Sequence, residues 1–122
     1  MAESCIFCRI VKGEIPSKKV YEDEWVLGLE DLNPAAPVHY LFLPKKHVRS
    51  LNELNLHQDS QDGEQLIARI FSAISKVTNK ENISDPGYKV AINTGVKGGQ
   101  SVFHLHVHLL AGKDFSSHFS HV

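Results

Sequence analysis

The stretch His104-Leu105-His106-Val107-His108-Leu109-Leu110 decides how this chain is interpreted, because histidine occupies every second position. Side chains on a β-strand alternate between its two faces. The pattern therefore predicts a strand over residues 102–110, with three imidazoles on one face and an apolar row on the other. Same-face neighbours lie about 6.7 Å apart and the outer pair about 13 Å. One metal ion reaches two neighbours easily but all three only at a bulge, so we expect one end to bind metal and the rest to perform chemistry.

A single histidine on a strand is usually a satisfied or exposed polar residue. Three on one face, after a glycine-rich loop, indicate a site. Because like charges disfavour ionisation, neighbouring imidazoles favour the neutral form that acts as a nucleophile. The loop over 94–100 holds Gly95, Gly98 and Gly99, whose backbone N–H groups can approach an anion closely. A phosphate-binding loop is the favoured interpretation, and a plain hairpin turn is the alternative.

Cys5 and Cys8 have the two-residue spacing that lets both thiolates bind one Zn²⁺ tetrahedrally. A thioredoxin-like redox role would require a preceding strand, which this position lacks. A structural zinc needs two more ligands, and His47 and His104 are the candidates. The alternative is a pair of free buried thiols.

The remaining pattern predicts a single α+β domain over residues 1–122. Strands without regular βαβ alternation, beside one long helix over 59–79, indicate an antiparallel sheet. The other expected strands cover 19–22, 25–30, 39–43 and 88–93. Residues 4–12 are expected to form a short knuckle around the cysteines. Three aromatic residues are expected in the core, namely Trp25, Phe42 and Phe71. Four histidines are expected on the surface without a function, namely His39, His57, His118 and His121.

Composition excludes several classes of protein. The 122 residues are 42% hydrophobic and 22% charged, with a formal net charge of -1. This balance provides no field that would recruit nucleic acid or an anionic membrane. No apolar run approaches the roughly 20 residues of a membrane helix, and no secretory pattern opens the sequence. We expect no nucleic-acid or membrane partner, reduced cysteines, and a cytoplasmic location with the nucleus as the alternative.

The chain resembles the histidine triad superfamily over nearly its whole length, in the Hint-like nucleoside phosphoramidase branch. The matching features, in order, are Asp31 with its proline-containing loop, Pro44-Lys45-Lys46-His47, Asn93, Gly98-Gly99-Gln100-Ser101 and the histidine stretch. The resemblance implies an antiparallel five-stranded sheet with one long helix. It also implies a homodimer whose two sheets join into ten strands. Zinc-binding members of the superfamily carry ligands at the positions of Cys5, Cys8, His47 and His104.

The resemblance implies catalytic roles for three residues. His106 is the nucleophile, which attacks the α-phosphate and forms a covalent nucleotidyl-histidine. His108 hydrogen-bonds phosphate oxygens, and Ser101 lies close to the departing amine. His104 and Asn93 would help to position the phosphate, although a His104 that ligates zinc cannot also touch it.

The implied ligand is a purine nucleoside monophosphate or one of its conjugates. Asp31 would bind the ribose hydroxyls, although it could instead cap its own loop. Leu29 and Leu32 would contact the base, and Gly99 and Gln100 complete the nucleotide-binding set. The implied activity is hydrolysis of AMP–amine conjugates. The alternatives are a dinucleoside polyphosphate hydrolase, as in the Fhit branch, and a zinc-stabilised nucleotide-binding or interaction module with little turnover.

Overall fold

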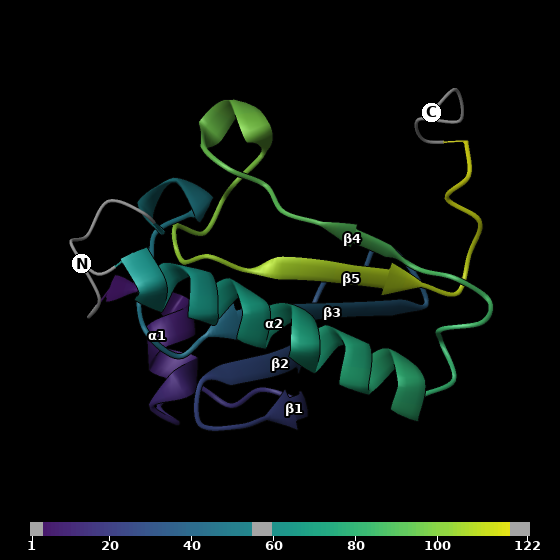
Figure 1. Cartoon of the computed structure of the whole chain (residues 1–122), viewed down its shortest axis with the longest axis horizontal. Helices are drawn as coiled ribbons and strands as arrows, with labels where there is room; N and C mark the ends of the chain where they lie inside the picture. The colour runs from purple at the N-terminus through teal and green to yellow at the C-terminus, as the bar shows by residue number, and fades with distance from the viewer. Residues whose placement is uncertain (1–3, 55–59, 118–122) are drawn as a thin grey trace.

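The expected α+β fold is confirmed. A computed structural model describes residues 4–54 and 60–117, and its core is a five-stranded antiparallel sheet in the order β1-β2-β3-β5-β4 (Figure 1). The strands are β1 (Lys19–Glu22), β2 (Val26–Glu30), β3 (Val38–Pro44), β4 (Lys89–Ala91) and β5 (Val107–Ala111). The helices are α1 (Ile6–Val11) and α2 (Ser60–Lys80), with short 3₁₀ turns η2 (Leu51–Glu53) and η3 (Val96–Gly98). None of the helices in the described ranges has the length and apolar character that a membrane crossing requires.

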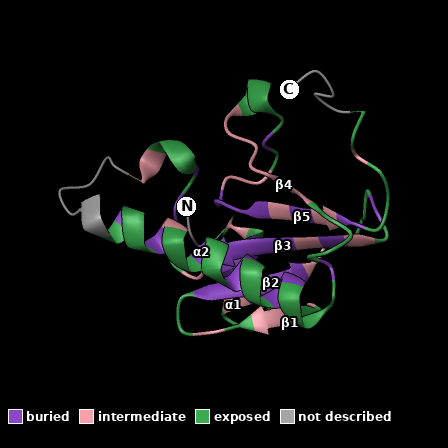
Figure 2. Cartoon of the chain, turned by 45° about the vertical axis from the view of Figure 1, so that its right-hand side comes forward, coloured by how far each residue is buried: buried purple, intermediate pink, exposed green. Residues whose placement is uncertain are grey.

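The long helix α2 covers one face of the sheet. Its inward side is buried and its outward side exposed (Figure 2). Ile70, Ile74 and Val77 recur at spacings of three and four and are at most 3% exposed. Each such side chain contributes about 1.5–3 kcal/mol when it is fully buried. The partners that they meet on the sheet side of this core are Val26, Phe42, Leu105, Val107 and Leu109.

Two of the three aromatic residues expected in the core are not there. Phe42 is fully buried, but Trp25 and Phe71 are each 42% exposed. Phe71 follows Ile70, so it lies about 100° around the helix from the buried stripe. Trp25 precedes β2 and carries the Arg69 guanidinium 4.4 Å above its ring.

The N-terminal knuckle is a helical turn on the opposite face of the sheet. In α1, the Cys5 sulfur accepts a hydrogen bond from the Cys8 backbone N–H at 3.4 Å and caps the helix. Phe7 and Ile10 are buried in a second apolar cluster. Its sheet members are Leu27, Leu29, Leu41 and Leu43. Because strand side chains alternate, this is also the face of His108.

The predicted strand over 102–110 is wrong in its first half. Pairing with β3 and β4 begins only at Val107 and His108, respectively. The segment before them is irregular, and its Leu105 N–H donates to Val48 O at 2.6 Å instead of joining the ladder. His104 and His106 therefore lie on an irregular segment that leads into β5, the approach to β5. The spacing between their rings does not have to follow the repeat of a regular strand. His57, His118 and His121 lie outside the described residues.

Candidate metal centre and active site

The structure brings together the four residues predicted to bind metal. Cys8 Sγ lies 3.2 Å from His47 Nδ1 and 3.5 Å from His104 Nδ1. Cys5 Sγ lies 3.4 Å from His104 Nδ1, and the two Nδ1 atoms are 3.2 Å apart. Tetrahedral zinc bonds of about 2.3 Å to sulfur and 2.0–2.1 Å to nitrogen place neighbouring ligand atoms about 3.3–3.8 Å apart. The donor set fits a zinc ion in both chemistry and spacing.

His104 is orientated for this role by a backbone carbonyl. Its Nε2 lies 2.8 Å from Pro44 O, and because a carbonyl only accepts, Nε2 carries the proton. Nδ1 therefore presents a lone pair to the cysteines and to His47, which is the outer-shell arrangement typical of metal-binding histidines. The ring is fully buried, and burial lowers its pKa to about 4. With both nitrogens engaged, His104 has no atom left for a phosphate.

Burial affects the thiol of Cys8 in the opposite direction. It raises the pKa of Cys8 to about 11, with the neighbouring Cys5 as the next cause. Without a cation Cys8 would remain protonated near pH 7, since its surroundings disfavour the thiolate. A divalent metal removes this obstacle because it binds the thiolate form directly.

His106 is held in the tautomer that a nucleophile needs. Its Nδ1 donates to His104 O at 2.8 Å, so Nε2 carries the lone pair. The ring is 8% exposed and meets Phe7 edge-on at a centroid distance of 5.1 Å. Burial lowers its pKa, which keeps the imidazole neutral near pH 7. Its centroid is also 5.1 Å from that of His108, which is closer than the repeat of a regular strand would place it.

His39 is the functional residue that the sequence interpretation missed. It is 8% exposed rather than on the surface, and its Nε2 lies 2.9 Å from His108 Nδ1. The register of β3 with β5 pairs His39 with Leu110 and Leu41 with His108. The two histidines are thus diagonal neighbours on one face. A prediction of the pairing register between β3 and β5 would have revealed this contact.

The tautomer of His39 follows from a backbone donor. Ala35 N–H donates to His39 Nδ1 at 3.0 Å, so the proton of the neutral ring is on Nε2. This proton points to His108 Nδ1 and lies near Asp31 Oδ2, which is 3.4 Å from the same nitrogen. His108 in turn carries its own proton on Nε2. Burial, followed by the charges of His106 and His39, lowers the His108 pKa to about 4.

These assignments separate the two groups of potential metal ligands in the described part of the chain. Asp31, His39 and His108 also offer ligand atoms close together. However, the nitrogen that His39 offers there is the protonated one, because its other nitrogen accepts from Ala35. In this group the Nε2–H of His39 therefore lies between two acceptors, His108 Nδ1 and Asp31 Oδ2, whereas the Cys/His group presents lone pairs to a cation.

The residues predicted to bind ribose and base lie at the end of β2. Asp31 Oδ1 accepts from Asn33 N–H at 2.8 Å, so the carboxylate caps its own loop and also faces His39. Leu29 is 3% exposed within the cluster under α1, whereas Leu32 is 90% exposed. The nucleotide contacts of these three residues stay predictions.

The glycine-rich loop is a structured turn. Gly99 has a φ of 87°, in the left-handed region that glycine adopts without strain. Asn93 Nδ2 donates to Gly98 O at 2.7 Å, which fixes the loop from inside. Ser101 follows the turn and is exposed. Its predicted contact with the leaving group, and the nucleotide contacts of Asn93 and Gly99, stay predictions.

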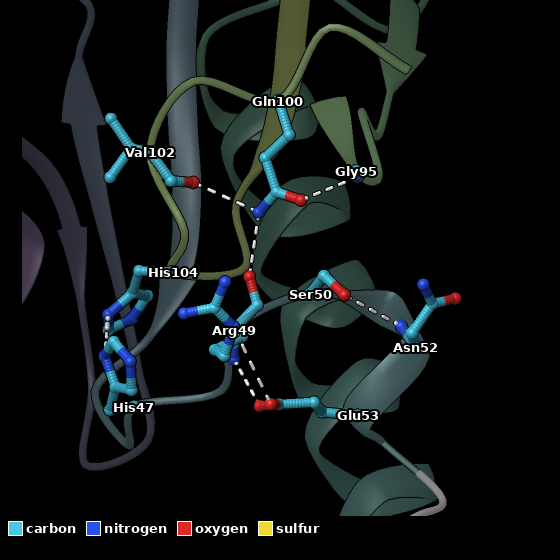
Figure 3. Close-up of polar contacts among 9 residues, drawn as sticks. All are labelled: His47, Arg49, Ser50, Asn52, Glu53, Gly95, Gln100, Val102 and His104. Atoms are coloured by element: carbon cyan, nitrogen blue, oxygen red, sulfur yellow. Dashed lines mark hydrogen bonds and ion pairs between the residues drawn. The ribbon is translucent and has the colours of Figure 1, made fainter. Parts of the chain in front are cut away.

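Gln100 is buried. Its side chain holds this loop to two other segments through the hydrogen bonds drawn in Figure 3. Its amide oxygen accepts from Gly95 N–H at 2.9 Å. Its amide nitrogen donates to Arg49 O at 2.8 Å and to Val102 O at 3.1 Å. The side chain therefore joins the loop, the segment after His47 and the approach to β5. This gives Gln100 a positioning role, and its predicted nucleotide contact is untested.

Comparison with known proteins agrees with this geometry. The family model described as "Scavenger mRNA decapping enzyme C-term binding" matches residues 4–121. The "Purine nucleoside phosphoramidase" of Escherichia coli K12 is 36% identical over 121 residues, which cover 99% of this chain and 98% of that protein.

Two solved structures resemble this chain at higher sequence identity than the E. coli relative does. A histidine triad protein from Clostridium difficile is 46% identical with a TM-score of 0.83, over 91% of this chain and 92% of that one. A HIT family hydrolase from Clostridium thermocellum is 45% identical with a TM-score of 0.84, over 93% of this chain and 94% of that one.

Proposed function

Because this chain belongs to the histidine triad family, we propose that it is a purine nucleoside phosphoramidase, which hydrolyses the P–N bond of AMP–amine conjugates through a nucleotidyl-His106 intermediate. The observation that carries the proposal is the hydrogen bond from His106 Nδ1 to His104 O. It leaves a lone pair on Nε2 of a neutral, largely buried imidazole, and this is the form that attacks phosphorus. The E. coli relative bears the name of this activity.

The reaction proceeds in two displacements at the α-phosphorus. In the first, His106 Nε2 forms a bond to phosphorus while the P–N bond to the amine breaks, and the amine takes up one proton as it leaves. In the second, water attacks phosphorus, loses a proton and displaces the imidazole, which releases AMP. Two easier steps replace one difficult displacement.

Charge on the phosphoryl oxygens is met by fixed donors. His108 is held with its proton on Nε2 by His39, so it can donate to a phosphate oxygen. Ser101 and the backbone of the glycine-rich loop are the other candidate donors. Because His39 Nε2–H already donates to His108 Nδ1, with Asp31 Oδ2 beside the same nitrogen, little reorganisation is needed as charge develops.

The metal belongs to the structure of the site and not to its chemistry. We infer that Cys5, Cys8, His47 and His104 hold one zinc ion, which the spacing of their ligand atoms supports. When bound, zinc supplies a cross-link between α1, the segment after β3 and the approach to β5. It thereby fixes His104, whose carbonyl orientates His106.

A homodimer is part of the proposal. In the order β1-β2-β3-β5-β4, the strand β4 lies at the edge of the sheet with β5 on one side. An edge strand can pair with a strand of another chain, and a second copy of β4 in that position would extend the sheet to ten strands. Light scattering on the protein as it elutes from a size-exclusion column should give twice the mass of one chain.

Mass spectrometry of the protein quenched during turnover of an AMP–amine conjugate tests the proposal. An acid-labile adduct with the mass of a nucleotidyl group should appear on His106. The His106→Ala variant should bind AMP but show neither adduct nor turnover. Turnover by that variant would remove His106 as the nucleophile. Faster cleavage of dinucleoside polyphosphates than of P–N conjugates would favour the polyphosphate hydrolase, and binding without turnover would favour the interaction module.

A further inference from the structure

A cavity of about 330 Å³ begins at the candidate metal centre, since Cys5 and His47 belong to its lining, and it extends beyond that centre. The part of its lining outside the metal group includes Arg49, Ser101 and Phe103. The proposed function makes Ser101 a candidate donor to the reacting phosphoryl group, and Ser101 also lines this cavity. On that function, the cavity borders the reacting phosphorus and can receive the group that leaves it. Its volume is at the lower end of the range of about 300–1,000 Å³ for small-molecule sites.

Arg49 is held in place at three points. Its guanidinium lies over the Phe103 ring, with the central carbon 5.0 Å from the ring centroid. Its backbone N–H donates to Glu53 Oε1 at 2.7 Å, and its backbone carbonyl accepts from Gln100 Nε2 at 2.8 Å (Figure 3). Since Gln100 also donates to Val102 O, it joins two of the segments that line the cavity. An arginine anchored in this way loses less freedom when it binds a ligand.

The charge of Arg49 is only weakly compensated. Glu53 Oε2 lies 4.0 Å from Arg49 Nε, at the limit of an ion pair, and the arginine side chain remains 55% exposed. The neighbouring metal centre adds no net charge, because two thiolates offset the charge of Zn²⁺. A guanidinium presents a planar fork of donors that matches a carboxylate or a phosphate.

We propose that this cavity is a subsite for an anionic group, a carboxylate or a phosphate, on the leaving side of the substrate, and that Arg49 is its specificity-determining residue. The inference rests on the proposed function and specifies its substrate class. The preferred conjugates are those in which the amine bonded to phosphorus carries an acidic group. A neutral amine of the same size fills the cavity without an ionic contact.

The experiment compares three P–N conjugates of AMP, made with glycine, with glycinamide and with 2-aminoethyl phosphate. The wild type should favour both acidic conjugates over glycinamide in kcat/KM. The Arg49→Gln variant should lower the preference for glycine over glycinamide about five- to tenfold, the effect of a charged hydrogen bond in a partly exposed site. The larger of the two preferences identifies whether a carboxylate or a phosphate is the better occupant.

Two further variants serve as controls. Arg69→Gln makes the same change of charge on α2, where the guanidinium lies over Trp25, and should leave the preference unchanged. Arg49→Lys keeps the charge without the fork, so its preference should be intermediate. An Arg49→Gln variant that loses activity equally on glycine and glycinamide conjugates would overturn the subsite while leaving the phosphoramidase standing. A wild type that cleaves none of the three would overturn both.

Discussion

His39 offers the sharpest test of how the site is organised, because its two ring nitrogens perform different tasks. Nδ1 accepts from Ala35 N–H, and Nε2 donates to His108 Nδ1. Asparagine places its amide near the Nδ1 position, whereas glutamine reaches the Nε2 position. His39→Asn should therefore keep a partner for Ala35 and lose His108. His39→Gln should keep a donor to His108 and leave the Ala35 N–H without its acceptor.

The expected magnitudes follow from these contacts. A hydrogen bond to the half-buried His108 is worth about 1–2 kcal/mol, and its loss raises the ratio of the competing to the competent tautomer by about 5- to 30-fold. The kcat of His39→Asn should fall by up to this factor with a smaller change in KM, because the competent His108 proton acts on charge that develops in the transition state. His39→Gln should keep more of kcat but unfold more easily, by about 1–3 kcal/mol for an unsatisfied buried N–H.

Three measurements decide the matter. Steady-state kinetics give kcat and KM, urea denaturation gives stability, and nitrogen NMR shifts report the tautomer of His108. If His39→Asn retained wild-type kcat with the His108 proton still on Nε2, His39 would not set the tautomer of His108. Equal behaviour of the two variants would also contradict the separation of roles.

Three other changes have defined outcomes. Metal analysis should find about one zinc per chain, and the His47→Ala variant should lose it while His106→Ala keeps it; metal-free, fully folded protein would refute the site. Folding lowers the pKa of His108 from 6.5 to about 4, so its contribution to the free energy of unfolding should be complete above pH 6.5 and be lost as pH falls toward 4. The free energy of unfolding of His108→Asn should therefore fall less steeply over that pH interval than that of the wild type. Gly63→Ala places a Cβ 2.1 Å from Leu54 O and should destabilise the fold by about 1–3 kcal/mol in urea titrations, whereas Gly98→Ala meets nothing within 4 Å and should not.

The sequence predicted the elements of the fold better than the course of the chain between them. The first three strands were located by the turn residues and prolines that bound them. The 3.6-residue period located the long helix, because burial on one face imposes it, and alternation located the last two strands. The same reasoning extended the last strand back to residue 102, since alternation continues there. It could not detect that Leu105 N–H is taken by Val48 O, a tertiary contact without a local signal.

In the candidate site too, the sequence predicted some residues and missed others. The group that could hold a metal was predictable because cysteine and histidine side chains are few and their chemistry is specific, so Cys5 and His47 could be matched across a distance in sequence. His39 was not, because one histidine on a strand gives no sign of its cross-strand neighbour. Leu32 is exposed and Leu29 buried, a difference that residue type alone does not indicate.

The irregular approach to β5 is what makes three alternating histidines useful. Along a regular ladder, carbonyls are engaged with neighbouring strands. Here pairing starts at Val107, so His104 O is available to accept from His106 Nδ1. Pro44 O assigns the proton of His104 in the same manner. Backbone groups thus determine which nitrogen of His104 faces Cys5, Cys8 and His47, and which nitrogen of His106 is left for the proposed attack on phosphorus. A continuous strand would hold the same imidazoles in a row without fixing either choice.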